Sequence, residues 1–457
     1  MRLDSLVLAT MLVATSVATP DIANAQASVP SRSASRNAPK FDPGTWATGI
    51  IVYGDTNWFN YMNLRVANDS LLGLAGRPPR FPIRGVLRGD SIEFVQYDDS
   101  SRARLHLRAT NRNARISGSC AVGVNNSVTL TDTFPCFITR LAERAGPPRS
   151  ITFEPTEFHR RFSAAIPPAL RIFPGDTIKT HTVDAGGVDK YGKKRSNGGN
   201  PETGPFYVEG AMPGDVVAIH LHRVRLNRDF ASAGSSLMTS AITPGLARGL
   251  PDVANFNSKW RLDLTRGVGT LWAPTAAMSR YEIPLRPMMG CIAVAPAQKQ
   301  SIRTQDSGPF GGNMDYNELR EGTTIYLAVN EPGALVFIGD GHAAQGDGEL
   351  TGDALETSMD VDFSVDIIRG ISIGGPRAEN AEYRMSIGIA GDLQEALRLA
   401  TSDMTRWLIA DYKLNAAEVA SVLGTAMRYD VADMVGTQIS IVAKVPKSAL
   451  LKLQPAK

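Results

Sequence analysis

The densest group of chemically capable side chains lies in residues 339–349, GDGHAAQGDGE, which continue the apolar, strand-like segment ALVFIG. The loop offers His342, the amide of Gln345, and carboxylates that include Asp340 and Glu349. Imidazole and carboxylate groups are the ligand types of hard and borderline divalent metals, and the glycines allow sharp turns. Because the same composition also suits a solvated turn, spacing alone leaves both interpretations open.

A second group is KTHTVDAGG at 179–187. Strand alternation places His181 and Val183 on one face, with Thr182 and Asp184 on the other. An aspartate at the end of a strand and before glycines serves either as a ligand or as a turn residue. Taken alone, the pattern at Asp184 favours the turn.

Two further polar loops, 200–215 and 311–319, each lead into a short ordered element. The second contains Asn313 and Asp315. Neither loop identifies a reaction by itself.

Two sequence patterns can indicate a catalytic nucleophile, but the residues around each of them favour a non-catalytic role. GISIG at 370–374 matches G-x-S-x-G, but β-branched residues flank Ser372 and Gly-Pro follows, so the helix that a nucleophile elbow requires is not expected. Cys291 lies in the apolar run MMGCIAVAP, where a cysteine is more often a small core residue than a catalytic one.

Short alternating runs between Gly44 and Leu141 predict antiparallel strands, among them 49–57, 61–69, 91–99, 103–111 and 127–133. They form a small all-β accessory module over 44–145, in which His106 is a strand-surface residue. The Gly-Pro-Pro at 146–148 marks a boundary. The larger region 150–457 is also strand-rich, with long Gly- and Pro-containing loops.

Helical periodicity appears only near the C-terminus. Asp392 with Glu395 three residues later is a capping-box pattern, and Leu393, Leu397, Ala400, Met404 and Leu408 fall on one face. A second helix is expected to start at Asn415, with Glu418 in the matching position, and QISIVAKVP predicts a closing strand.

The composition is that of an ordinary folded protein. The chain has 457 residues, 43% hydrophobic and 20% charged, with a net charge of +3. These values exclude disordered, collagen-like and coiled-coil proteins and do not indicate a nucleic-acid partner. At ~150 residues per domain, the length suggests about three domains' worth of chain.

The N-terminus predicts export. Arg2, an apolar run from Leu6 to about Ala18 and the A-x-A sequence Ala23-Asn24-Ala25 form a signal-peptide pattern over 1–25, followed by a linker over 26–43. The apolar run is too short for a membrane span, so a periplasmic or secreted protein is expected after cleavage near Ala25. An oxidising compartment permits a Cys120–Cys136 disulfide, with two buried thiols as the alternative.

Several long strings, taken in order, resemble the acetamidase/formamidase family: THTVDAGG, NPETGPFYVEGAMPGD, GCIAVAPA, GGNMDYNELREGTTIYL and PGALVFIGDGHAAQGDGE. The tail through MRYDVADMV to VAKVPKSAL is similar as well. The resemblance covers about 154–450, with an interruption between Leu226 and Pro284 that we interpret as a lid or wall. It does not include the N-terminal module.

The resemblance implies a mainly β, sandwich-like fold with C-terminal helices and a homo-oligomer, dimer or higher. It also implies hydrolysis of the carbon–nitrogen bond of linear amides with release of ammonia. Asp184, His342, Asp340 and Glu349 are the implied metal ligands, and Asn313 and Asp315 would bind substrate. The cofactor would be a divalent metal, with zinc favoured and calcium as the alternative.

The residue types suit that chemistry. A divalent metal lowers the pKa of water and polarises an amide carbonyl. Glu349, with His342 beside it, would move the proton from water to the leaving amine, and Gln345 would donate to the oxyanion. The competing interpretation is a periplasmic binding protein that keeps the fold and the metal loop without turnover. A third hypothesis is that the N-terminal module binds a surface glycan or a partner and positions the enzyme.

Overall fold

The computed structural model describes residues 43–77, 79–88, 91–97, 101–108, 115–124, 132–250 and 256–453. The predicted signal peptide, nearly all of the predicted linker and most of the predicted strand 127–133 lie outside these ranges. No helix within them is long and apolar enough to cross a membrane.

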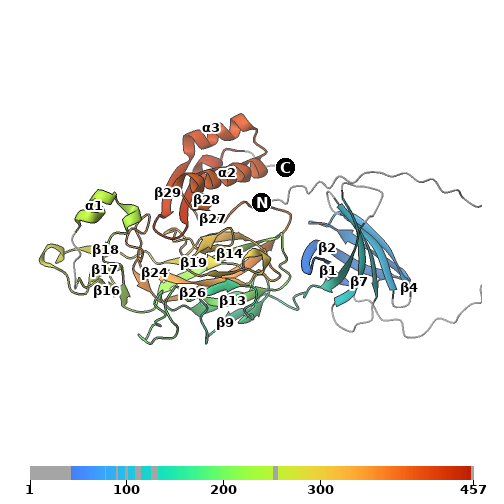
Figure 1. Ribbon diagram of the computed structural model, residues 1–457, viewed down its shortest axis with the longest axis horizontal. Coiled ribbons are helices and arrows are strands. Elements are labelled where there is room, and N and C mark those ends of the chain that lie inside the picture. The colour runs from blue at the N-terminus through green and yellow to red at the C-terminus, as the bar shows by residue number, and fades with distance from the viewer. Residues whose placement is uncertain are drawn as a thin grey trace, which may run out of the picture. The chain divides into compact units, whose positions relative to one another are not determined.

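The N-terminal module is a closed barrel of eight antiparallel strands, each paired with its neighbour in the chain and β1 with β8 (Figure 1). Inward-facing side chains such as Leu71, Ile92 and Leu105 alternate with exposed ones and fill the interior. The strands are β1 (Gly44–Val52), β2 (Asp55–Ala67), β3 (Ser70–Ala75), β4 (Phe81–Arg88), β5 (Ser91–Tyr97), β6 (Ser101–Arg108), β7 (Arg115–Val124) and β8 (Asp132–Arg140).

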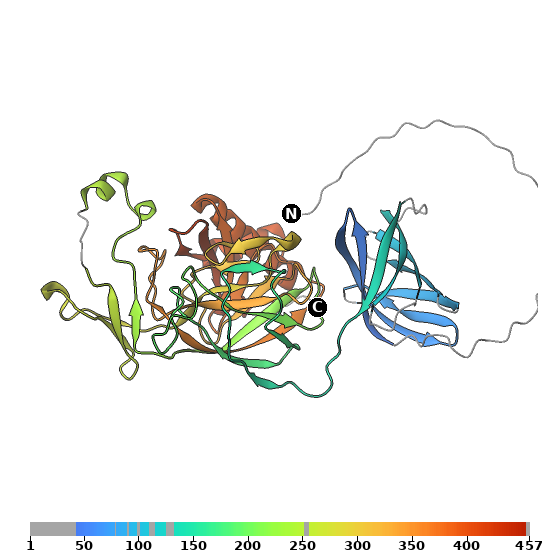
Figure 2. The same cartoon turned by 60° about the horizontal axis from the view of Figure 1, so that its bottom comes forward.

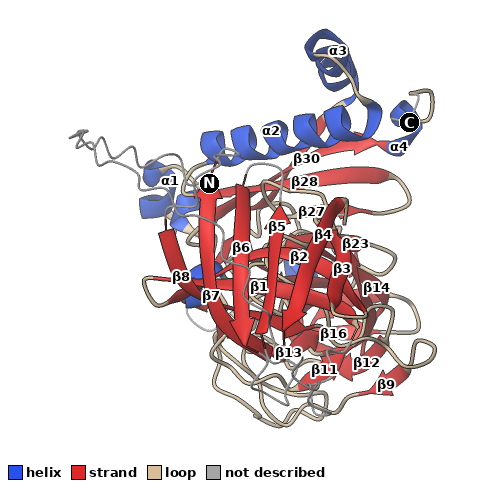
Figure 3. Ribbon diagram, turned by 90° about the vertical axis from the view of Figure 1, so that its right-hand side faces the viewer, coloured by secondary structure: helices blue, strands red, loops and turns tan. Residues whose placement is uncertain are grey.

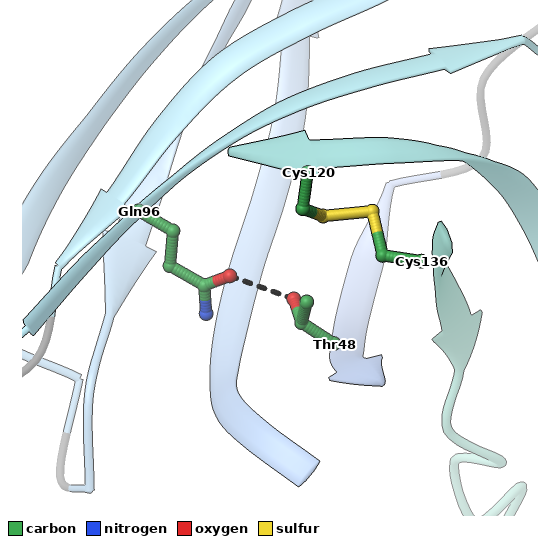
Figure 4. The surroundings of a disulfide bond; sticks show 4 residues. All are labelled: Thr48, Gln96, Cys120 and Cys136. Carbon is green, nitrogen blue, oxygen red and sulfur yellow. Dashed lines mark hydrogen bonds between the residues drawn. A yellow bond between two sulfur atoms is a disulfide. The ribbon is translucent and has the colours of Figure 1, made fainter. Parts of the chain in front are cut away.

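A disulfide joins β7 to β8 inside this barrel. Cys120 and Cys136 are both buried, with their Cα atoms 5.8 Å apart, so the predicted bridge is confirmed. Figure 4 shows the bridge beside a buried hydrogen bond of 2.6 Å from the Thr48 hydroxyl to Gln96 Oε1. Closing a loop of this length contributes about 3 kcal/mol to stability.

The rest of the chain forms two large sheets and one small one, in strand orders that follow the chain only in part. A nine-stranded sheet has the order β29-β30-β28-β27-β23-β14-β26-β12-β9, and an 11-stranded sheet has β18-β17-β16-β15-β25-β24-β19-β22-β21 with β13 and β11 joined at β24. Strands β10 (Arg161–Ser163) and β20 (Ser301–Arg303) pair separately.

The strands of the nine-stranded sheet are β9 (Ser150–Thr152), β12 (Thr177–His181), β14 (Val216–Leu226), β23 (Thr324–Ala328), β26 (Met359–Ile368), β27 (Arg377–Glu379), β28 (Tyr383–Ala390), β29 (Arg428–Asp433) and β30 (Ile439–Pro446). Those of the 11-stranded sheet are β11 (Leu170–Ile172), β13 (Thr203–Val208), β15 (Phe230–Ser232), β16 (Lys259–Asp263), β17 (Val268–Leu271), β18 (Glu282–Pro284), β19 (Met288–Ala293), β21 (Ser307–Gly308), β22 (Gly311–Asn313), β24 (Val336–His342) and β25 (Glu356–Thr357).

A single apolar core lies between the two large sheets. Its residues come from both, and Phe206 of β13 packs edge to face against Phe363 of β26 with ring centroids 5.2 Å apart. Two β-sheets that bury facing apolar sides form a sandwich. The predicted mainly β, sandwich-like fold with C-terminal helices is therefore confirmed.

Helices α2 (Leu393–Tyr412) and α3 (Ala416–Ala426) begin where the sequence predicts. Asp392 caps α2 by accepting from the Glu395 amide at 2.9 Å, and Asn415 and Glu418 form a complete capping box on α3. Figure 3 shows α2 alongside β28 and β30. The remaining helical elements are α1 (Pro244–Gly249), α4 (Lys447–Leu450), η1 (Thr239–Ala241), η2 (Ala276–Met278) and η3 (Ala297–Lys299).

The buried face of α2 differs from the predicted one in its first turns. Leu393 and Leu397 are exposed, whereas Ala396 and Asp403 are buried with Met404. The reason is a close approach of the helix to β28 at Gly388, where only small side chains fit, together with a bidentate ion pair between Asp403 and Arg377, 2.6 Å at its shortest.

The segment that interrupts the family resemblance, between Leu226 and Pro284, adds β15, β16, β17 and β18 to the 11-stranded sheet beyond β25. Figure 2 shows it in yellow-green at the end of that sheet, with α1 in a longer excursion. The segment thus forms a wall, which is one of the two alternatives, lid or wall, that the sequence suggests. We call it the insert.

Candidate active site

Strand β24 carries the central side chains of the site. All seven of its residues are buried, and it lies between β19 and β25. Asp340 and His342 are two residues apart, and Asp340 has a left-handed φ of 53°, which distorts the strand at this point. The apolar segment before them therefore anchors two polar groups in the interior of the sandwich.

Glycine 290 on the neighbouring strand β19 leaves room for these groups. A Cβ atom at this position would lie 2.5 Å from Asp315 Oδ1, 2.9 Å from His342 Cε1 and 3.0 Å from Asp340 Oδ2. A side chain at Gly290 would therefore fill the space on which the polar atoms converge.

Two overlapping acidic groups share His342. Asp315 and Glu349 form one with the histidine, and Asp340 and Glu356 form the other, with the ligand-type atoms of each group within 4.8 Å of one another. His342 Nε2 is 3.2 Å from Glu356 Oε1 and 3.5 Å from Asp340 Oδ2. One imidazole is thus shared by two pairs of carboxylates.

Gln345 fixes the orientation and tautomer of the histidine ring. Its Nε2 donates to the carbonyl oxygens of Asp315 and Ala432, so its Oε1 faces His342 Nδ1 at 2.8 Å. An amide oxygen only accepts hydrogen bonds, and Nδ1 therefore carries a proton. Nε2 is left directed toward the carboxylates, as in histidines held for metal binding.

Several buried atoms at this point have no hydrogen-bond partner. They are His342 Nε2, Asp315 Oδ1, Asp340 Oδ1 and Glu356 Oε2. Buried polar atoms without partners are costly, and four of them on the residues of the two acidic groups fit a bound cation. The donor set of one nitrogen and several carboxylate oxygens suits a divalent metal.

The buried carboxyl groups of the site also need a nearby positive charge if they are to ionise together. Burial, reinforced by neighbouring carboxylates, raises the pKa of Asp315 well above its usual range, that of Glu349 to about 7 and that of Glu356 to about 8. Burial lowers the pKa of His342, but the charges of Glu356 and Asp340 outweigh this and raise it. These acids therefore resist ionising together without a cation.

A pocket of about 230 Å³ opens onto the cluster, and Asp340, Glu349, Glu356 and Asn313 are in its wall. Asn200 lies there too and donates at 2.8 Å to both Asn313 Oδ1 and Asp340 Oδ2. Asn313 in turn donates to Asp315. Of the two predicted substrate-binding residues, Asn313 therefore borders the pocket, whereas Asp315 is fully buried within the metal-type cluster.

Asp184 lies apart from both groups. Its carboxylate accepts from Arg228 Nη2 at 2.6 Å and from the Val188 amide at 2.8 Å, although the adjacent Ala185 borders the pocket. The structure thus brings together three of the four predicted ligands, His342, Asp340 and Glu349, and gives Asp184 a buried arginine partner.

Sequence reasoning missed Glu356 and Asp433. Glu356 lies directly opposite His342 in the β24–β25 pair, and Asp433, near the end of β29, borders the pocket. Asp433 falls in the quoted string MRYDVADMV, but Glu356 follows the last quoted motif. Only the strand register reveals it.

The two nucleophile patterns have no catalytic setting. Cys291 is completely buried, and burial raises the pKa of its thiol well above the usual range, so it is not a thiolate. Ser372 lies in an exposed loop between β26 and β27, without the strand–turn–helix of a nucleophile elbow.

Part of the chain is similar to a known protein family. Residues 273–385 match the model of the Acetamidase/Formamidase family, a range that holds every member of both acidic groups. A candidate formamidase of Schizosaccharomyces pombe is 25% identical over 254 residues, which are 44% of this chain and 61% of that protein. The matched part of this chain thus spans less than two thirds of that relative.

Solved structures give wider coverage. The acetamidase of Yersinia enterocolitica is 28% identical with a TM-score of 0.57, over 67% of this chain and 94% of that one. The acetamidase of Bacillus halodurans is 25% identical with a TM-score of 0.56, over 66% and 99%. The predicted family resemblance is confirmed by these matches.

Proposed function

We propose that this chain, which matches the acetamidase/formamidase family through the strands that carry its polar cluster, hydrolyses linear primary amides. The reaction converts RCONH₂ and water to a carboxylate and ammonia. The observation that carries the proposal is the convergence of buried, unpartnered atoms of His342, Asp315, Asp340 and Glu356 beneath a pocket large enough for a small amide.

His342 Nε2, Asp315, Asp340 and Glu356 would hold a divalent cation, with zinc favoured because of the imidazole and calcium as the alternative. When bound, such a cation lowers the pKa of water and polarises a carbonyl. The role of Asp315 therefore changes from substrate contact to ligand in this proposal. Asp184 instead supports the loop through its ion pair with Arg228.

Glu349 is the proposed general base. Its carboxylate borders the pocket and lies next to His342 and Asp315, so it can reach a water or an amide bound over the cluster and accept and return a proton there. It would take the proton from the attacking water and pass it to the amide nitrogen as the carbon–nitrogen bond breaks. The products are then the carboxylate and ammonia.

Gln345 is proposed as a positioning residue rather than an oxyanion donor. Both ends of its amide group are already used, one by His342 and the other by two backbone carbonyls. Asn200 and Asn313 are the pocket amides proposed to orient the substrate, because their mutual hydrogen bond fixes both side chains at the pocket wall.

The competing function is binding without turnover. A carboxylate base on the pocket wall favours the enzyme, since a binding protein has no use for a proton acceptor there. Ammonia release from formamide, acetamide and propionamide tests the choice. Release by the parent chain that Glu349→Gln abolishes supports hydrolysis, whereas amide binding without ammonia supports the binding protein.

Export and self-association complete the proposal. The N-terminal signal pattern supports a periplasmic or secreted protein, and the Cys120–Cys136 bridge is consistent with an oxidising compartment. Export predicts a mature N-terminus at Gln26 in the extracytoplasmic fraction. Light scattering of the purified protein tests the proposed homo-oligomer, which rests on the family resemblance alone.

A further inference from the structure

A second and larger pocket lies beside the acidic one. Its volume is about 540 Å³, against about 230 Å³ for the pocket over the cluster, and Glu349 and Asp353 are in the walls of both. Gln345, which holds the histidine ring, also borders the larger pocket. The proposed base therefore stands between two spaces of different character.

The insert supplies the apolar side of this pocket. Trp260 and Leu271 belong to a hydrophobic cluster that the insert forms with Ala343 and Leu355, the first of which directly follows His342. Tyr281 packs edge to face on Trp260, with ring centroids 6.1 Å apart, yet remains 49% exposed. An aromatic ring left half open at a pocket wall offers a surface for an apolar or aromatic ligand.

The opposite side is the chain that follows His342. The Ala343 amide donates to the Leu355 carbonyl, and the Ala343 carbonyl accepts from the amide of Arg286, two residues after the insert, each at 2.8 Å. Thus the insert continues the sheet that holds the cluster rather than lying over it as a separate lid. A substituent reaching past Glu349 would meet Ala344, Met278 and the Trp260–Tyr281 pair.

We propose that this larger pocket, here called the insert pocket, binds the acyl substituent of the amide and selects bulky apolar or aromatic groups. The inference rests on the proposed amide hydrolysis. The preferred substrates are then primary amides of arylalkanoic or long-chain acids rather than formamide or acetamide. Apolar contacts of this size discriminate between substrates by about tenfold or more for each buried methylene-sized increment.

The far side of the site offers a different selectivity. Arg303 and Gln305 border the acidic pocket and also a third one of about 440 Å³, which contains Arg160 and Arg161. That surface suits a carboxylate-bearing amide. The insert pocket is favoured because Glu349 itself forms part of its wall.

Ammonia release from acetamide, 3-phenylpropionamide and succinamic acid separates these cases. The proposal predicts kcat/KM for 3-phenylpropionamide at least tenfold above that for acetamide. Tyr281→Ala and Ala233→Phe, which respectively remove and fill part of the pocket, should each reduce that ratio several-fold, mainly through KM. The matched control is Trp272→Ala, because Trp272 is 48% exposed on the insert but does not border the pocket.

Equal rates for the two uncharged amides, or a ratio untouched by both pocket variants, would overturn the inference while leaving amide hydrolysis intact. A preference for succinamic acid would overturn it in favour of the arginine-lined pocket. If no amide releases ammonia, the proposed function fails. Calorimetry with 3-phenylpropionamide then tests ligand binding in the insert pocket independently of hydrolysis. Binding that Tyr281→Ala weakens supports the inference, and the absence of binding overturns it.

Discussion

The interior of the barrel and the centre of the sandwich follow opposite rules. Among the described barrel residues, the buried polar side chains are Thr48, Asn60 and Gln96, none of them charged, and a disulfide crosses the interior. The centre of the sandwich instead buries His342 among four carboxylates and leaves several of their atoms without partners. The first arrangement favours stability, and the second sacrifices stability for a ligand.

This contrast indicates where substitutions should affect folding and where they should affect activity. Removing apolar contacts or the bridge from the barrel should lower the free energy of unfolding without changing the site. Removing a carboxylate from the cluster should change the site but should not lower the free energy of unfolding. In the absence of a cation, the removal relieves repulsion between like charges.

Glu349→Gln should reduce kcat for amide hydrolysis by about 10²–10⁴-fold, the usual contribution of a general base. The melting temperature in the presence of chelator should stay the same or rise, because one buried acid is removed. Steady-state ammonia release and calorimetry measure the two effects. Near-parental kcat would remove Glu349 from the chemistry.

Gly290→Ala should lower metal affinity and activity by at least about tenfold, because the new Cβ would lie 2.5 Å from Asp315 Oδ1. Gly424→Ala is the matched control, since nothing lies within 4 Å of the Cβ position there and the residue is in α3. Equal metal content in the two variants would contradict the proposed position of the cation.

Gln345→Ala should weaken metal binding by about 10–100-fold, because it frees the His342 ring from its fixed tautomer. Added metal should restore most of the lost kcat, as expected of a positioning residue. Gln345→Glu, which keeps an acceptor opposite Nδ1, should recover part of the affinity. An oxyanion role would instead lower kcat at every metal concentration.

The double substitution Cys120→Ser with Cys136→Ser should lower the free energy of unfolding of the barrel by about 3 kcal/mol. Activity at 25 °C should remain at the parental level, because the bridge lies within β7 and β8. Denaturant unfolding and ammonia release check both parts. A large loss of activity in the folded variant would mean that the two interiors are coupled.

The sequence predicted much of this contrast. The loop 339–349 was distinctive because histidine, glutamine and carboxylates rarely gather so closely, and the starts of α2 and α3 were recognisable from the spacing of their capping residues. Barrel strands β3, β4 and β7 were not expected, and of β8 only Asp132 and Thr133 fall in a predicted strand. Glycines and a proline weaken their strand patterns, yet Gly73 is required where a Cβ would meet the Asn63 carbonyl oxygen at 2.0 Å.

What the sequence could not provide was pairing between distant residues. Glu356 becomes part of the cluster only through its register opposite His342, and Gly290 only through its neighbour Asp340. The partner of Asp184 is Arg228, 44 residues along the chain and inside the insert. The sequence pattern at Asp184 favoured a turn, and the family resemblance implied a metal ligand, but neither gives this arginine partner.

We propose that amide hydrolysis depends on a cation held by the acidic cluster. The most direct test is elemental analysis of the purified protein together with ammonia release before chelation, after chelation and after reloading with zinc or calcium. The purified protein should hold about one divalent ion per chain, lose activity when that ion is removed and recover it with one of the two metals. Full activity in metal-free protein would contradict it.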